Sequence, residues 1–189
     1  MVRRHVSDGD GKAASDSGRA TDGAPLTAWL LLPPDYVAGT RVPVVTVVYP
    51  GSMYGAAQPS SFSLFRRDFV HPQLFAALGY AVLLPSMPPP KDLAESHSIP
   101  QLSSGVLPAI DAVVERGIAD SQRIGLAGQS DGCFAVLGLI TQTTRFRSAI
   151  ASAGFSDLVR RFDSPRTPSS VTAFTPVRAK NSIIRASDA

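Results

Sequence analysis

The chain has 189 residues, of which 44% are hydrophobic and 17% charged, and its formal net charge at pH 7 is +3. This composition is typical of a globular protein with one core and excludes a disordered chain. Lysine and arginine are scattered rather than gathered with aromatic residues, so nucleic acid is not expected as a partner. No apolar run approaches the roughly 20 residues that cross a bilayer, which predicts no membrane association.

The first residues and the single cysteine indicate the cellular compartment and bear on disulfides and metal sites. The basic start has no apolar stretch behind it, as a signal peptide would, and this favours a cytoplasmic protein. Cys133 is alone, so no internal disulfide can form, and no Cys/His cluster has the spacing of a zinc site. We therefore expect no metal and no other cofactor. The sequence does not indicate an oligomeric state.

Strands and helices alternate along the middle of the chain. Residues 1–25 show no periodicity and are expected to be a flexible lead-in or a junction to a further amino-terminal domain. Strands are then predicted at 26–36, 42–51, 80–86, 123–128 and 148–154, and helices at 71–79, 107–117 and 133–144. Such alternation predicts an α/β fold, with a mostly parallel sheet and helices on both of its faces.

Three segments are expected to lack regular structure. Residues 51–63 form a predicted loop, and the proline-rich stretch 87–100 excludes a helix or strand. The last stretch, 163–189, holds three prolines and many Ser, Thr and Arg residues without a period, which predicts an irregular tail. The catalytic unit is thus expected to span residues 26–162.

The main candidate for chemistry is the G-x-S-x-G motif at residues 128–132, between a predicted strand and a predicted helix. A nucleophilic serine on such a turn has a strained backbone and an outward hydroxyl, and side chains at the flanking glycines would collide with the strand or helix. The turn also directs the amide of Asp131 toward a developing oxyanion. The alternative for Ser130 is an ordinary serine in a glycine-rich loop.

A second oxyanion donor is expected from the loop after an earlier strand. Tyr49 ends the predicted strand in "VVYPGS", and its phenol can donate one hydrogen bond. The alternative is a core tyrosine whose hydroxyl is satisfied by its neighbours.

The stretches "LTAWLLLPPDYVAGTRVPVVTVVYPG", "FAALGYAVLLPS" and "RIGLAGQSDGCFAVLGLITQTTRFRSAIASAG" resemble, in this order, the catalytic domain of the prolyl oligopeptidase family. The resemblance covers roughly residues 26–158 and implies an α/β-hydrolase fold and a serine peptidase that acts on peptides. It also implies that Ser130 is the acyl-forming nucleophile, with Tyr49 and the amide of Asp131 forming the oxyanion hole. Cys133, where many members have glycine, is interpreted as a buried structural thiol rather than a nucleophile.

The family's triad order is Ser, then Asp, then His, and here the sequence departs from it. No histidine follows Ser130, and Asp157 comes too early by topology, with only Asp163 and Asp188 beyond it. We therefore expect a chain that is cut short at the carboxyl end and is inactive as a peptidase.

The three histidines of the chain all precede Ser130. His5 lies in the lead-in and His71 at a helix start, while His97 lies in the proline-rich loop at the same sheet edge as Ser130. His97 is the least implausible substitute base, although a surface histidine is the preferred interpretation.

Two further functions stay open: a serine esterase on the same fold, and a non-catalytic remnant that keeps the elbow. A nucleotide-binding fold is weaker still, because the glycines fit neither phosphate-binding motif.

Overall fold

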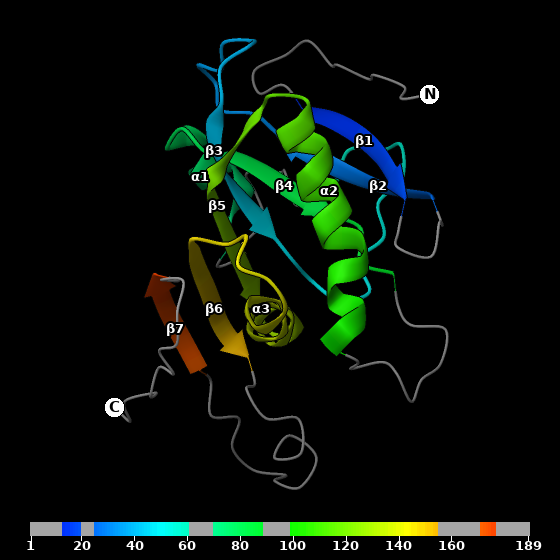
Figure 1. Cartoon of the computed structure of the whole chain (residues 1–189), viewed down its shortest axis with the longest axis vertical. Coiled ribbons are helices and arrows are strands. Elements are labelled where there is room, and N and C mark those ends of the chain that lie inside the picture. Colours follow the sequence, from blue (N-terminus) through cyan, green and yellow to red (C-terminus); the bar gives the residue numbers. More distant parts are fainter. Residues whose placement is uncertain (1–12, 20–24, 61–69, 89–98, 155–170, 177–189) are drawn as a thin grey trace, which may run out of the picture.

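The computed structural model describes residues 13–19, 25–60, 70–88, 99–154 and 171–176, and these form one mixed sheet with flanking helices (Figure 1). The strands are β1 (Ala13–Arg19), β2 (Pro25–Leu31), β3 (Val42–Val47), β4 (Ala81–Pro85), β5 (Ala119–Gln129), β6 (Ser148–Gly154) and β7 (Val171–Pro176). The helices are α1 (Pro72–Ala77), α2 (Ser103–Glu115) and α3 (Asp131–Gln142), with a 3-10 turn, η3, at Ile99–Leu102.

The centre of the sheet is parallel and its edges are antiparallel. The strand order is β1-β2-β4-β3-β5-β6-β7. Strand β3 pairs in parallel with β4 and β5, and β5 pairs in parallel with β6, whereas β1, β2 and β7 run antiparallel to their neighbours. The predicted α/β class is confirmed, and the carboxyl ends of β3, β5 and β6 meet at one edge of the sheet.

Both faces of the sheet carry apolar residues, because the central strands alternate between two cores. Leu83 of β4 lies in the core that includes Val106 of α2 and Leu139 of α3. Its neighbours Val82 and Leu84 lie in a second core with Ala76 of α1. Helices therefore cover both faces, α2 and α3 on one and α1 on the other, as the alternation predicts. No helix among the described residues has the length and apolar character of a membrane span.

Two segments that were expected to be irregular contain strands. Within the predicted lead-in, β1 pairs with β2, and within the predicted tail, β7 pairs with β6 (Figure 1). The expectation of irregular structure was wrong for these residues. Both are edge strands, which are held by main-chain hydrogen bonds to one neighbour and need no apolar alternation of their own.

Helix α2 begins four residues earlier than the predicted start at residue 107. Its buried face already includes Val106 and continues through Ile110 and Val113, and Leu102 extends the same core into the preceding turn. This spacing is helical, but Leu107, which the prediction took as the first apolar position, is only half-buried. The start was misplaced because the buried face of the helix begins ahead of Leu107, at Gly105 and Val106.

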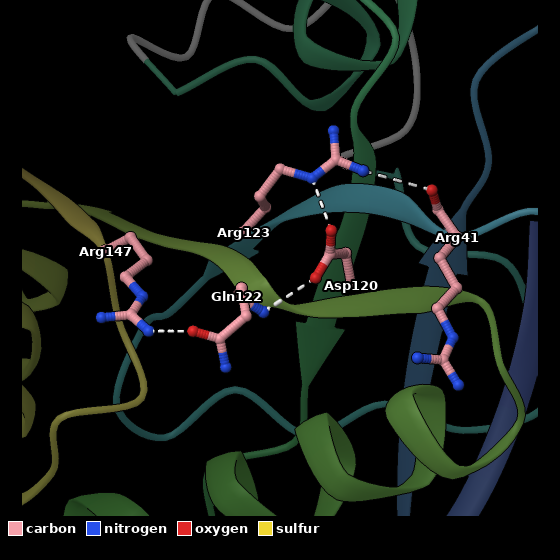
Figure 2. A network of polar contacts seen from close by, with 5 residues as sticks. All are labelled: Arg41, Asp120, Gln122, Arg123 and Arg147. Carbon is pink, nitrogen blue, oxygen red and sulfur yellow. Dashed lines mark hydrogen bonds and ion pairs between the residues drawn. The ribbon is translucent and has the colours of Figure 1, made fainter.

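Arginine side chains anchor the opposite, amino ends of the strands (Figure 2). The Arg123 guanidinium donates to an Asp120 carboxylate oxygen at 2.6 Å and to the carbonyl oxygen of Arg41 at 3.4 Å. Asp120 also accepts the Gln122 amide at 2.9 Å, and Arg147 of the segment before β6 donates to Gln122. The pKa of the Asp120 carboxyl lies below its usual value. The hydrogen bond from the main-chain amide of Gln122 is the largest cause, and the hydrogen bond from the Arg123 side chain is the next. This network joins β3, β5 and β6 at the end of the sheet remote from Ser130.

One buried hydroxyl in the central strand predicts a stabilising substitution. Thr46 is fully buried between Leu83 and Leu126, and its Oγ1 has no hydrogen-bond partner among the described residues. Thr46→Val keeps the shape and removes the unpaired hydroxyl, so we expect the free energy of unfolding to rise by about 1 kcal/mol. Thermal denaturation should show this as an increase of about 2–4 °C in Tm.

Thr141→Val is the matched control, because the Thr141 hydroxyl already donates to the Gly138 carbonyl oxygen at 2.7 Å. It should leave Tm unchanged or lower it slightly. A Thr46→Val protein that melts below the unmodified chain would show that the Thr46 hydroxyl has a partner, such as a bound water.

Candidate active site

Ser130 occupies a strained turn between β5 and α3. It is the N-cap residue of α3, with φ 57° and ψ −120°, and only one other described non-glycine residue, Ala153, has a positive φ. A non-glycine residue adopts this conformation only where its surroundings impose it. The side chain makes no capping hydrogen bond to the described first turn of α3 and lines a pocket instead. The predicted geometry of the elbow is therefore confirmed.

The two glycines of the motif allow the turn to close. A Cβ at Gly128 would lie 2.3 Å from the carbonyl oxygen of Gly132. A Cβ at Gly132 would lie 2.4 Å from the carbonyl oxygen of Val48, at the end of β3. Both contacts are with main chain, which cannot move aside as a flexible side chain would. The G-x-S-x-G spacing thus places the start of α3 directly against β5 and β3, as the sequence predicts.

Strand β6 holds the main chain of Ser130 from the other side. The Ser130 amide donates to the carbonyl oxygen of Ser152 at 3.0 Å. Across from it, a Cβ at Gly154 would lie 2.4 Å from the Ser130 carbonyl oxygen. The amide and carbonyl of Ser130 are both packed against β6, which explains how its unfavourable φ is maintained.

Tyr49 lies beside Ser130 because their strands are neighbours. Strands β3 and β5 are parallel, and Tyr49 and Ser130 each follow the carboxyl end of one of them. Both line one pocket of about 660 Å³, and Tyr49 is 45% exposed. The Tyr49 ring therefore lies at the surface of the site and not in the core, in contrast to the alternative of a core tyrosine.

The remaining candidates fall into distinct places. Asp131 is the first residue of α3, so its amide is among the N–H groups at the helix N-terminus. Cys133 is fully buried, and burial raises the pKa of its thiol, which fits a structural residue. His71 is the N-cap residue of α1; its Nδ1 is buried without a partner among the described residues, and it is not one of the pocket-lining residues.

His5, His97 and the three late aspartates lie outside the described residues. In the part of the chain that the structure describes, no three His, Cys, Asp or Glu side chains gather as metal ligands would.

Sequence reasoning missed the residues that form most of the pocket. They include Met53 and Tyr54 of the loop after Tyr49, and Val47 and Leu84 of the central strands. Nothing in the sequence distinguishes this loop from other irregular segments, apart from its place after the central strand.

Comparison with known proteins shows which family part of the chain is similar to. The sequence model of the prolyl oligopeptidase family matches residues 103–181, and thus extends past residue 158, where the resemblance was expected to end. Dipeptidyl-peptidase 5 of Porphyromonas gingivalis is 28% identical over 161 residues, which are 76% of this chain and 21% of the relative. A probable chloroplastic glutamyl endopeptidase of Oryza sativa subsp. japonica is 29% identical over 145 residues, or 70% of this chain and 16% of the relative. The chain spans about a fifth of the length of the curated relatives it matches.

Solved structures agree with this placement. The apo structure of the isopeptidase AtxE2, known from Asticcacaulis excentricus, is 28% identical and superposes with a TM-score of 0.57 over 78% of this chain and 24% of that one. The acylaminoacyl peptidase of Pyrococcus horikoshii, 22% identical, shares the fold with a TM-score of 0.61 over 82% of this chain and 25% of that one. Over residues 103–181 the chain is therefore similar to the prolyl oligopeptidase family, and its mostly parallel sheet with flanking helices is the α/β-hydrolase fold that its structural neighbours share.

Proposed function

We propose that Ser130 is the nucleophile of a serine peptidase site of the prolyl oligopeptidase type. The observation that carries the proposal is the positive φ of Ser130 at a strand–helix junction, beside a pocket that Tyr49 also lines, in a chain similar to this family. The hydroxyl of Ser130 would attack the carbonyl carbon of a bound peptide and form an acyl-enzyme, and water would later release the acyl group.

The oxyanion formed in this attack would be bound from two directions. The Asp131 amide lies at the N-terminus of α3, where the aligned peptide dipoles favour negative charge. The Tyr49 hydroxyl would donate the second hydrogen bond. Support for this pair comes from the parallel pairing of β3 with β5, which brings both donors to the sheet edge that holds Ser130.

The attack also needs a base that accepts the Ser130 proton. In the 189 residues no histidine follows Ser130. We therefore propose that the chain as it stands acts slowly, through the oxyanion hole and substrate binding, and not through an activated serine.

The elbow does not determine whether an amide or an ester is cleaved, so a serine esterase on the same fold remains the second candidate. The relatives are named as different kinds of peptidase, namely a dipeptidyl-peptidase, a probable glutamyl endopeptidase and a lasso peptide isopeptidase. Their names therefore leave the specificity of this chain open, beyond a peptide substrate.

Hydrolysis of an activated ester tests the proposed site. The chain is expected to hydrolyse p-nitrophenyl acetate on the order of 10³-fold faster than water does, since an intact oxyanion hole retains this much without a base. Ser130→Ala should lower the rate further, because the acyl-enzyme can no longer form, and should leave only the direct attack of water in the oxyanion hole. Tyr49→Phe should lower it by about a hundredfold, because one oxyanion donor is lost.

Tyr80→Phe is the matched control for Tyr49→Phe. Tyr80 stacks edge-on against Phe75 and is not a pocket-lining residue, so the rate should not change. Ester hydrolysis as fast in Ser130→Ala as in the unmodified chain would contradict the assignment of the nucleophile, and an unaltered rate in Tyr49→Phe would contradict the second oxyanion donor.

A further inference from the structure

We propose that Ser86 is a positioning residue for this site, and that its hydroxyl fixes the pocket wall that contacts an apolar group of the substrate. The inference rests on the proposed function of Ser130. Ser86 follows β4 directly and is 1% exposed, so its hydroxyl is a buried polar group that requires partners. It has two, and they belong to different segments of the chain.

The Ser86 hydroxyl connects the pocket wall to the sheet. It donates to the carbonyl oxygen of Thr27 in β2 at 2.6 Å and accepts the amide of Tyr54 at 2.9 Å. The hydroxyl thereby uses its donor and one acceptor at the same time. The Ser86 amide also donates to Thr27, at 3.2 Å, which fixes the serine main chain on β2. Tyr54 is thus joined to β2 through one side chain.

The rest of the loop is held by its two ends. At its start, the Gly51 amide donates to the Met87 carbonyl oxygen at 2.9 Å, and the Met87 amide donates to the Ser52 carbonyl oxygen at 2.7 Å. At its end, the indole N–H of Trp29 donates to the Gly55 carbonyl oxygen at 3.0 Å. Ser86 acts between these two ends.

The segment so held forms one side of the pocket. Residues 52–55 all line it, as does Ser130. Met53 is 55% exposed and has no extensive packing that would fix it independently. The Ser86 and Trp29 hydrogen bonds therefore help to fix the main-chain position of residues 53 and 54. Because Met53, Tyr54 and the neighbouring Val70 and Leu84 present apolar surface, this wall would bind an apolar part of a substrate.

Ser86→Ala removes the acceptor of the Tyr54 amide and leaves the backbone bonds of Met87 in place. The Tyr54 amide, whose hydrogen bond is part-buried, then lacks its acceptor on Ser86, so the segment around Tyr54 should shift or open. The measured quantity is the ratio of kcat/KM for p-nitrophenyl hexanoate to kcat/KM for p-nitrophenyl acetate. We expect this ratio to decrease about tenfold, which corresponds to a loss of about 1.4 kcal/mol of binding to the longer acyl chain. A ratio within one variant is unaffected by partial unfolding.

Two variants and one further measurement complete the test. Ser86→Thr keeps the hydroxyl and should restore the ratio. Ser148→Ala, at the start of β6 and remote from the pocket, should leave the ratio unchanged. Hydrogen–deuterium exchange of the Tyr54 amide should accelerate in Ser86→Ala and not in Ser148→Ala, independently of any activity.

An unchanged hexanoate-to-acetate ratio in Ser86→Ala, with Ser130-dependent hydrolysis retained, would overturn the inference about Ser86 alone. Accelerated exchange at Tyr54 without a change in the ratio would do the same, because it would limit Ser86 to a structural role. Hydrolysis that does not depend on Ser130 in the unmodified chain would overturn the proposed function, and this inference with it.

Discussion

A peptide anilide is expected to turn over on the 189-residue chain about a millionfold more slowly than on a serine peptidase with an intact triad. The reason is the leaving group. A nitrophenolate departs without a proton, whereas an anilide nitrogen has to be protonated, and the same base has to deprotonate Ser130 first. The measurement compares a chromogenic peptide anilide with the matching nitrophenyl ester, using Ser130→Ala for the background of each.

The ester is the internal control, because its slow hydrolysis shows that the site is folded. Anilide turnover at the rate of an ordinary peptidase, dependent on Ser130, would contradict the expectation and would require a base among the histidines that precede Ser130. His97→Ala is then the variant to assay, and His71→Ala its control.

The second large effect is expected on stability. Gly132→Ala places a methyl group 2.4 Å from the Val48 carbonyl oxygen, a main-chain atom directly after the central strand β3. Because neither α3 nor β3 can withdraw without disturbing the core, we expect the free energy of unfolding to fall by about 3 kcal/mol. Thermal denaturation should show a decrease of about 10 °C in Tm.

Gly55→Ala is the matched control, since a Cβ at Gly55 meets nothing within 4 Å and its φ is not in the left-handed region. Its Tm should stay within about 2 °C of the unmodified chain, as for other surface substitutions. If both glycine variants melt alike, α3 has room to move away from β3, and the close contact at Gly132 does not fix the elbow.

The elbow could be predicted because its signal is local. Within five residues, the glycines at 128 and 132 and the serine between them specify a tight turn, and the apolar stretches on either side indicate a strand and a helix. The position of Tyr49 beside Ser130 could also be predicted, because parallel strands bring their carboxyl ends to one edge of the sheet. Both arguments need only the order of elements along the chain.

The pocket wall could not be predicted, because the contacts that shape it join residues far apart in sequence. Ser86 and Thr27 are 59 positions apart, and Ser86 and Tyr54 are 32 apart. A single serine after a strand carries no periodic pattern that indicates such partners. The edge strands β1 and β7 were not predicted for a related reason. Main-chain pairing to one neighbour does not require a regular pattern of side chains in the sequence.

The contacts between Ser130 and β6 have an evolutionary consequence. They involve the carbonyl oxygen of Ser152 and the absent side chain of Gly154, and no side-chain functional group of β6 takes part. Substitutions at residue 152 that keep the strand intact and fit its buried site should therefore leave the orientation of Ser130 unchanged, so this position can vary among small side chains as lineages diverge. Residue 154 cannot vary in this way, because any side chain there would meet the carbonyl oxygen of Ser130. Positions 152 and 154 of one strand thus differ in the substitutions they tolerate. At residue 152 the contact with Ser130 is made by the main chain, and at residue 154 it is limited by the volume of the side chain.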